Sequence, residues 1–341
     1  MKQAVMTSPG VIEFRDVPVP KPGPEEVLIR VRRIGVCGSD IHVRHGRHPF
    51  TSYPVVQGHE FSGVIEAVGK RVRGLRPGQK VTATPQIVCG RCAPCRRGDY
   101  HICDVLRVQG FQSPGCAQEY FQVRAEQIVP LPGSFTFEQG ALVEPAAVGV
   151  HTVSRAGTMA GTNVAVLGAG PIGNLVGQVA RAAGAKVLLT DISEFRLEIA
   201  RKCGLRSVSL AGRETLKDAS ARVFGAKGFQ KAFECAGAES AINEAIDAIQ
   251  KGGTIVAVGV YGDRPRVNMG LVQDRELTLT GTLMYQKRDF VKAVRLMRSG
   301  ALVTKPLETT HFPFGDYRAA YDFADREGER SMKIFVDLET D

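Results

Sequence analysis

Three side chains that commonly bind zinc occur close together near the start of the chain: Cys37, His59 and Glu60. A thiolate, an imidazole and a carboxylate are typical protein ligands of a catalytic zinc ion, which keeps one position open for a substrate. Neighbouring residues of a strand point to opposite faces, so His59 and Glu60 can bind one ion together only from a bend, which the preceding Gly58 permits. The sequence therefore predicts a catalytic zinc site here.

A second carboxylate, Glu144, is an alternative third ligand. It lies in the apolar segment Leu142-Val143-Glu144-Pro145-Ala146, and a lone carboxylate is seldom buried without a partner. A carboxylate at the start of a helix, favoured by the helix dipole, is the other interpretation. The residues alone leave the choice between Glu60 and Glu144 open.

Two further polar residues follow the cysteine of this set. Ser39 and His42 are three residues apart, a spacing that suits a hydroxyl–imidazole pair able to move a proton beside the ion. An ordinary loop histidine is an equally good interpretation of His42.

Four of the eight cysteines are clustered within fifteen residues. In a reducing compartment such a cluster indicates metal binding rather than disulfides. Four thiolates leave no open position on the ion, which predicts a closed, structural zinc site. An iron–sulfur cluster and four unligated thiols are the alternatives, and we expect His101, inside this loop, to lie at the surface. The four predicted ligands are Cys89, Cys92, Cys95 and Cys103.

A glycine-rich turn in the middle of the chain predicts a dinucleotide site. The apolar run 164–167 leads into a Gly-x-Gly-x-x-Gly pattern, followed by a helical pattern over 172–183. The first glycine permits the tight turn, the second lets the backbone approach a pyrophosphate, and the third lets the helix pack on the strand. The residues expected at the cofactor are Gly168, Gly170, Pro171, Ile172 and Gly173.

An acidic residue ends the next predicted strand. Asp191 lies 18 residues after the last glycine of the pattern, where a carboxylate accepts hydrogen bonds from ribose hydroxyls and repels a 2′-phosphate. This favours NAD over NADP, although Arg196 nearby can attract a phosphate.

The secondary-structure patterns that must position these residues differ between the two parts of the chain. Up to about residue 130, short β-branched runs are separated by Gly and Pro, which predicts a compact β-barrel-like domain. The segment 137–153 is Ala-rich and predicted to be helical. From residue 163, strand and helix patterns alternate, as in a parallel α/β sheet. Residues 288–298 read as a helix, and 332–338 as a strand that can return to the first domain.

Bulk composition agrees with two soluble domains. The chain has 341 residues, of which 43% are hydrophobic and 23% charged, and such a length exceeds one ordinary core. The net charge of +9 is spread along the chain without a basic run or aromatic platform, so we expect no nucleic-acid function. Without an apolar run long enough for a membrane span or a signal peptide, we expect a cytoplasmic protein with no membrane association.

These motifs, in this order, resemble the zinc-dependent medium-chain alcohol and polyol dehydrogenases, along essentially the whole chain. The likeness is strongest to the branch that holds sorbitol, L-threonine, butanediol and sugar-acid dehydrogenases. It implies a GroES-like β-barrel catalytic domain, residues 1–148 and 285–341, and a Rossmann domain, residues 149–284, with the active site in the cleft between them. It also implies two zinc ions, NAD, and a homodimer or homotetramer.

The resemblance assigns roles to particular residues. Cys37, His59 and either Glu60 or Glu144 match the catalytic zinc ligands, and Ser39 with His42 matches the proton relay. Two further segments match stretches that line the nicotinamide end of the cofactor: Val258, Gly259 and Val260, and Leu283, Met284 and Tyr285.

The expected reaction is the reversible oxidation of a secondary alcohol to a ketone by hydride transfer, on a polyol or a sugar acid such as L-gulonate or L-galactonate. Val43 and Met284 depart from the residues of animal sorbitol dehydrogenases, while the loop 48–54 resembles bacterial sugar-acid enzymes. Four basic residues could supply charge for a substrate carboxylate, although a solvated loop is an equally good interpretation: Arg44, His45, Arg47 and His48.

Other functions remain as alternatives. The segment 281–285 is similar to that of butanediol-type enzymes, which keeps a vicinal-diol dehydrogenase, or an L-threonine-type enzyme, open. A zinc-free reductase of the quinone oxidoreductase type is disfavoured by Cys37 and His59. A non-catalytic dinucleotide-sensing protein on the same fold is disfavoured by the combination of metal set and relay.

Overall fold

The computed structural model of the protein describes residues 1–338. The chain forms two compact units. The first comprises Met1–Glu144, Gln286–Val294 and the chain from Glu308 on, and the second comprises Pro145–Tyr285 and Arg295–Leu307. Among the described residues, no helix has the length and apolar character that a membrane span requires.

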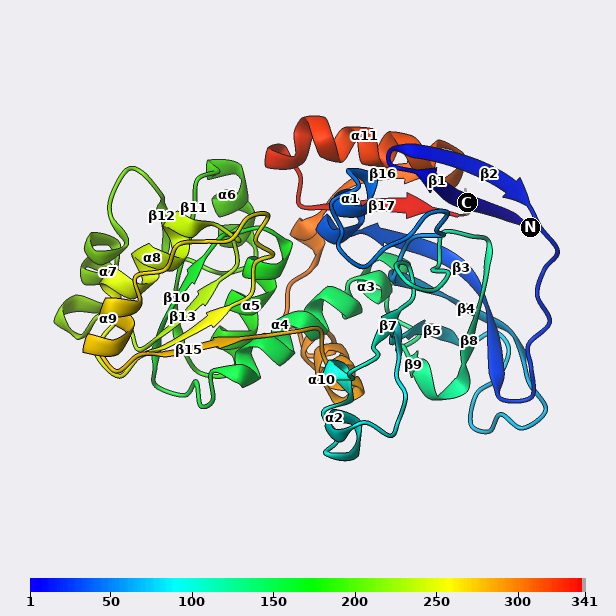
Figure 1. The fold of residues 1–341 in the computed structure, drawn as a ribbon, viewed down its shortest axis with the longest axis horizontal. Coiled ribbons are helices and arrows are strands. Elements are labelled where there is room, and N and C mark those ends of the chain that lie inside the picture. Colours follow the sequence, from blue (N-terminus) through cyan, green and yellow to red (C-terminus); the bar gives the residue numbers. More distant parts are fainter. Residues whose placement is uncertain (339–341) are drawn as a thin grey trace. The chain divides into compact units, whose positions relative to one another are not determined.

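The first unit is rich in β-structure (Figure 1). Its strands are β1 (Lys2–Ser8), β2 (Val11–Asp16), β3 (Glu26–Val36), β4 (Glu60–Val68), β5 (Lys80–Ala83), β6 (Gln86–Ile87), β7 (Arg107–Val108), β8 (Tyr120–Arg124), β9 (Ile128–Pro130), β16 (Glu308–Pro313) and β17 (Lys333–Asp337). Its helices are α1 (Gly38–Arg44), α2 (Ala93–Arg96), α3 (Phe137–Ala141) and α11 (Tyr317–Glu327).

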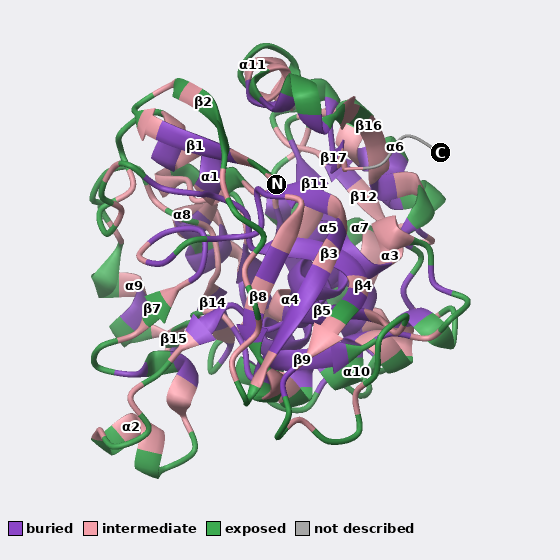
Figure 2. Ribbon diagram, turned by 90° about the vertical axis from the view of Figure 1, so that its right-hand side faces the viewer, coloured by how far each residue is buried: buried purple, intermediate pink, exposed green. Residues whose placement is uncertain are grey.

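Strand β3 organises the first unit. One of its edges pairs with β4, and the other pairs with β8 along its first half and with β17 along its last residues. The C-terminal segment therefore returns to the first unit as strand β17, as the sequence predicted. In β3 the side chains of Val27, Ile29, Val31 and Ile34 are buried in the core of this unit. Figure 2 shows this buried band running along β3, β4 and β5.

The second unit is a six-stranded parallel sheet with the order β12-β11-β10-β13-β14-β15. Numbered from its first strand, this is the order 3-2-1-4-5-6 of a doubly wound dinucleotide-binding fold. The strands are β10 (Asn163–Leu167), β11 (Lys186–Asp191), β12 (Val208–Leu210), β13 (Lys231–Glu234), β14 (Thr254–Ala257) and β15 (Thr278–Gly281). The helices are α5 (Pro171–Ala182), α6 (Glu194–Lys202), α7 (Leu216–Phe224), α8 (Glu239–Ala248) and α9 (Met269–Asp274).

Two helices belong to both units: α4 (Val143–Arg155) and α10 (Lys287–Arg298). The segment 137–153, predicted as helical, contains a break. Helix α3 ends at a C-cap on Leu142, and α4 begins at the next residue with Glu144 in its first turn. Pro145 cannot donate a hydrogen bond from its nitrogen to the turn before it, which explains why a new helix starts at this position.

Candidate active site

A bend before strand β4 brings His59 and Glu60 to one site. Gly58 adopts φ +89°, a conformation that side chains disfavour. A Cβ at this position would also lie 2.8 Å from the sulfur of Cys116. His59 therefore leaves the strand geometry that would turn it away from Glu60. Ligand atoms of Cys37, His59 and Glu60 all lie within 4.8 Å of one another.

Helix α1 fixes the cysteine of this set. Cys37 is the N-cap residue, and its backbone N–H donates to Asp40 Oδ2 at 3.0 Å. The other oxygen of Asp40 lies 3.6 Å from His59 Nδ1. Asp40 thus holds the Cys37 backbone and faces the His59 ring, as a carboxylate behind a metal-binding histidine does when it fixes the orientation of the ring. Sequence reasoning missed Asp40, although its position three residues after a cysteine at a helix start was a usable signal.

Glu60 forms a buried ion pair with Lys333, a residue that sequence reasoning also missed. The two side chains are 1% and 4% exposed. They meet across Gly35 of β3, where an added Cβ would lie 2.5 Å from Glu60 Oε2 and 2.9 Å from Lys333 Cε. Three adjacent strands, β17, β3 and β4, therefore build this pair.

Negative charge exceeds positive charge around His59. Burial lowers the pKa of His59, but the nearby acidic groups of Asp40, Cys37 and Glu144 outweigh it and raise that pKa well above its usual value. The positive charges of His59 and Lys333 act on Asp40, against the negative charge of Glu60. Buried anions require a cation. A thiolate, an imidazole and a carboxylate in such a place fit Zn²⁺.

The other predicted residues lie around this set. Glu144 is 5% exposed, and its charge acts on His59 and Lys333. It is not part of the close group of ligand atoms, whereas Glu60 is. Ser39 and His42 lie three residues apart on α1, hence on one face of that helix, and both are partly buried.

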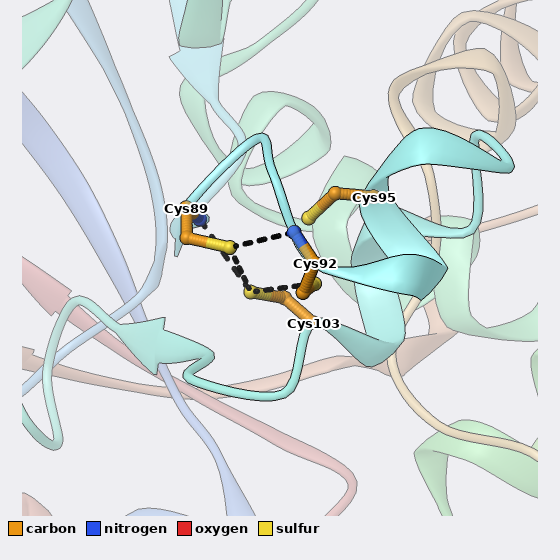
Figure 3. Close-up of side chains that lie close together, drawn as sticks. All are labelled: Cys89, Cys92, Cys95 and Cys103. Carbon is orange, nitrogen blue, oxygen red and sulfur yellow. Dashed lines mark hydrogen bonds between the residues drawn. The ribbon is translucent and has the colours of Figure 1, made fainter.

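The four clustered cysteines converge at the end of a separate loop (Figure 3). Their ligand atoms lie within 4.8 Å of one another. Cys103 Sγ is 3.6 Å from Cys89 Sγ and 3.8 Å from Cys92 Sγ. A zinc–sulfur bond of about 2.3 Å gives a tetrahedron with edges near 3.8 Å, so the spacing fits one zinc ion. Backbone N–H groups of Arg91 and Cys92 lower the pKa of Cys89 to about 6, which favours a thiolate.

The zinc loop is attached to the start of helix α10. Gln286 Nε2 donates to the Gly98 carbonyl and to His101 Nδ1, both at 3.1 Å. The Lys287 backbone N–H donates to the Tyr100 hydroxyl at 2.6 Å. The expectation that His101 lies at the surface is wrong: it is 7% exposed because it anchors this contact.

The glycine turn of the second unit has the predicted form. Gly168 has φ +99°, and a Cβ on Gly173 would lie 1.8 Å from the Gly168 carbonyl oxygen. At Gly170 an added Cβ meets nothing within 4 Å. Helix α5 begins there, with Gly170 as N-cap and Pro171 in its first turn, followed by Ile172. The open space at a helix start with unpaired backbone N–H groups suits a pyrophosphate.

Asp191 lies beside this turn. Its Oδ2 accepts the Ala169 backbone N–H at 2.6 Å, and its Oδ1 accepts that of Ser193 at 2.8 Å. Arg196 Nη1 is 3.9 Å from Oδ2. A carboxylate has about four acceptor positions, so Asp191 keeps capacity for ribose hydroxyls.

The loops that follow strands β13 and β14 pack closely against each other at Gly237 and Gly259. A Cβ on Gly259 would lie 2.1 Å from the Gly237 nitrogen. The N–H groups of Val258 and Gly259 donate to the Glu234 carbonyl. Sequence reasoning missed the Glu234 side chain, which is fully buried and accepts N–H groups of the turn 236–238 and the hydroxyl of Tyr261. It thereby shapes the loop that carries Val260.

Leu283 and Met284, the other predicted cofactor residues, follow the end of β15. Leu283 is 52% exposed, and Met284 has φ +50°. A positive φ is uncommon for a residue other than glycine and marks a sharp turn of the backbone here.

A doubly wound sheet with this glycine turn, together with two zinc-ligand sets, defines a zinc-dependent dinucleotide dehydrogenase. Comparisons with known proteins agree. Residues 23–133 match the model of the alcohol dehydrogenase GroES-like domain, and residues 171–299 match that of the zinc-binding dehydrogenases.

Individual relatives align over nearly the whole chain. 2-Dehydro-3-deoxy-L-galactonate 5-dehydrogenase of Pseudoalteromonas atlantica is 36% identical over 92% of this chain and 91% of its own. Sorbitol dehydrogenase of Bacillus subtilis is 30% identical over 98% and 97%. The structure of an E. coli CFT073 alcohol dehydrogenase complexed with NADH superposes with a TM-score of 0.91, covering 99% of both chains at 27% identity.

The chain belongs to the zinc-dependent medium-chain alcohol dehydrogenase family. It is an NAD-dependent oxidoreductase that acts on CH–OH groups, with a GroES-like domain and a Rossmann-type domain. Its two ligand sets and glycine turn fit two zinc ions and NAD.

Replacing one clustered cysteine tests the structural zinc site. We expect Cys95→Ser to lose one zinc ion per chain by metal analysis and to lower the unfolding temperature by roughly 5–10 °C, because the loop loses the ion that folds it. Arg91→Ser, an exposed change in the same loop, is the control and should keep both ions. A Cys95→Ser protein with undiminished zinc would contradict the assignment.

Substitutions at two glycines of the turn test the contact with the cofactor and the packing of the fold separately. Gly170→Ala should keep the wild-type unfolding temperature but weaken NADH binding at least tenfold or so, since its methyl enters open space that the pyrophosphate needs. Gly173→Ala should also destabilise the fold, by about 1–3 kcal/mol, because its methyl collides with the backbone. Thermal unfolding and NADH fluorescence titration measure both effects. Unchanged NADH binding by Gly170→Ala would refute this assignment.

Proposed function

We propose that the protein oxidises a secondary alcohol of a polyol or a sugar acid to the ketone, with NAD as the hydride acceptor. The observation that carries the proposal is the buried group of Cys37, His59 and Glu60, whose excess negative charge fits a zinc ion beside a proton-carrying pair on α1. The relatives with this architecture include sugar-acid and polyol dehydrogenases.

The roles of the residues follow from their chemistry. Cys37, His59 and Glu60 would hold the catalytic zinc, and Glu144 supplies a further buried negative charge next to them. Zinc, when bound, acts as a Lewis acid on the substrate hydroxyl, and NAD accepts the hydride. Ser39 accepts the proton of the substrate hydroxyl as it releases its own, and His42, on the same face of α1, takes up the released proton and passes it to solvent.

The cofactor is held by the second unit. The backbone N–H groups of Gly170, Ile172 and Gly173 would bind the pyrophosphate, whereas Pro171 has no N–H to offer. Asp191 would accept hydrogen bonds from the ribose hydroxyls. Arg196 lies beside Asp191 as its ion partner. The segments 258–260 and 283–284 line the nicotinamide end.

We also propose that the protein is a homodimer or homotetramer. Strand β15 is an edge strand of the six-stranded sheet, and Leu279 on it is 38% exposed. Met269 of the same unit is 58% exposed. An apolar edge strand is prone to pair with another chain.

The eight cysteines form no disulfide among the described residues, which suits a reducing, cytoplasmic location.

A substrate panel tests the proposed reaction. The zinc-replete protein is offered a hexitol, the matching hexonate, 2,3-butanediol and L-threonine at equal concentrations, and NADH formation is followed. We expect the highest kcat/KM on the hexitol or the hexonate. A clear preference for butanediol or L-threonine would replace the proposed substrate class, and absence of turnover with all four would contradict the proposal.

A further inference from the structure

His48 is connected to the candidate metal ligand His59 through an aromatic ring. His48 stacks on Phe111, with ring centroids 4.6 Å apart and planes within 12°. Phe111 in turn contacts the ring of His59, at 5.0 Å between centroids. His48 therefore lies one aromatic ring away from a residue of the zinc-ligand set. Burial lowers the pKa of His48, and the charges of His42 and His59 lower it further.

The position of His48 is fixed by its surroundings. Thr51 Oγ1 is 2.7 Å from His48 Nδ1. The loop is tied to the segment that carries Phe111, because Gln112 Nε2 donates to the Phe50 carbonyl at 3.0 Å. Tyr53, two residues beyond Thr51, donates its hydroxyl to the carbonyl of Val43 on α1. A hydrogen bond to one ring nitrogen of a histidine determines whether the other nitrogen carries the proton.

The second nitrogen of His48 is not used by the protein. Among the described residues, Nε2 has no hydrogen-bond partner, and the side chain is only partly buried. When the Thr51 hydroxyl donates to Nδ1, Nε2 carries the proton and is a donor. The loop thus presents one polar group, on a stacked ring, close to the candidate active site.

Other basic residues of this loop are occupied elsewhere. Arg44 forms ion pairs with Asp322 and Asp325 of helix α11. His45 Nε2 lies 3.0 Å from Asp325 Oδ1. Their charge is balanced by α11, so neither is suited to receive a substrate. Arg47 is exposed. Of the four basic residues that the sequence suggested for a carboxylate, His48 has the contacts that lead to His59.

We propose that His48 is a specificity-determining residue, whose Nε2 donates a hydrogen bond to a substrate oxygen remote from the carbon that is oxidised. The stacked Phe111 ring forms the adjacent wall. The oxygen belongs to a hydroxyl of a polyol or to the carboxylate of a sugar acid, and both accept from an imidazole N–H. This inference rests on the proposed function and specifies which residue recognises the distal part of the substrate.

Two substitutions separate the hydrogen bond from the packing. His48→Phe keeps an aromatic ring for the stack on Phe111 and removes the donor, whereas His48→Gln keeps a side-chain N–H and removes the ring. His45→Ala takes a histidine from the same loop and is the matched control. Each variant is assayed with a hexitol, the matching hexonate and 2-butanol, which has no remote oxygen. Zinc content is measured alongside.

We expect His48→Phe to raise KM for the hexitol or hexonate roughly tenfold or more, the usual loss for one such hydrogen bond. Its kcat and KM for 2-butanol and its zinc content should match the wild type, and His48→Gln should recover part of the loss. A larger effect on the hexonate identifies the carboxylate as the bound group, and an equal effect identifies a hydroxyl. Equal losses on all three substrates, or no loss on any, would overturn the inference.

Binding measured without turnover separates this inference from the proposed function. Calorimetric titration of the hexitol and hexonate into the zinc-replete protein with NADH compares wild type and His48→Phe. Weaker binding by the variant supports the role of His48 even where the wild type does not oxidise these compounds. Equal affinity for both proteins, or no binding by either, overturns it.

Discussion

The surplus of buried negative charge around His59 is the constraint on which the first unit depends. Asp40 and the Cys37 thiol lie at the start of α1, Glu60 lies on β4, and Glu144 lies in the first turn of α4. Each buried carboxylate is costly without a positive partner. The protein supplies one buried lysine and one histidine. A bound dication would balance the remainder, so the same groups that make the apo site unfavourable also make it selective for a metal.

Strand pairing is what assembles this charge. Gly35 leaves room on β3 for the Glu60–Lys333 pair, Gly58 turns His59 toward Glu60, and Asp40 caps the turn that presents Cys37. In the second unit the site is shaped by glycines, which have no side chain. There Gly168, Gly170 and Gly173 bring strand, turn and helix close enough for a pyrophosphate to meet backbone N–H groups.

Much of this could be predicted from the sequence where the signal is local. The sequence signals for the four-cysteine loop, for the glycine turn with Asp191, and for the set of Cys37, His59 and Glu60 are short spacings and simple residue chemistry. Lys333 could not be found this way, because its contact with Glu60 exists only once β17 pairs beside β3. Phe111 and His48 meet through a loop contact, and His101 is buried by helix α10. These are tertiary effects with no periodic pattern.

The central claim is that Cys37, His59 and Glu60 hold a zinc ion on which turnover depends. Zinc content and NADH formation of Cys37→Ser, measured against the wild type on the same substrate, test it most directly. We expect two zinc ions per chain in the wild type and one in the variant, with an intact fold by circular dichroism and turnover lost. A variant that keeps both ions and full turnover would contradict it.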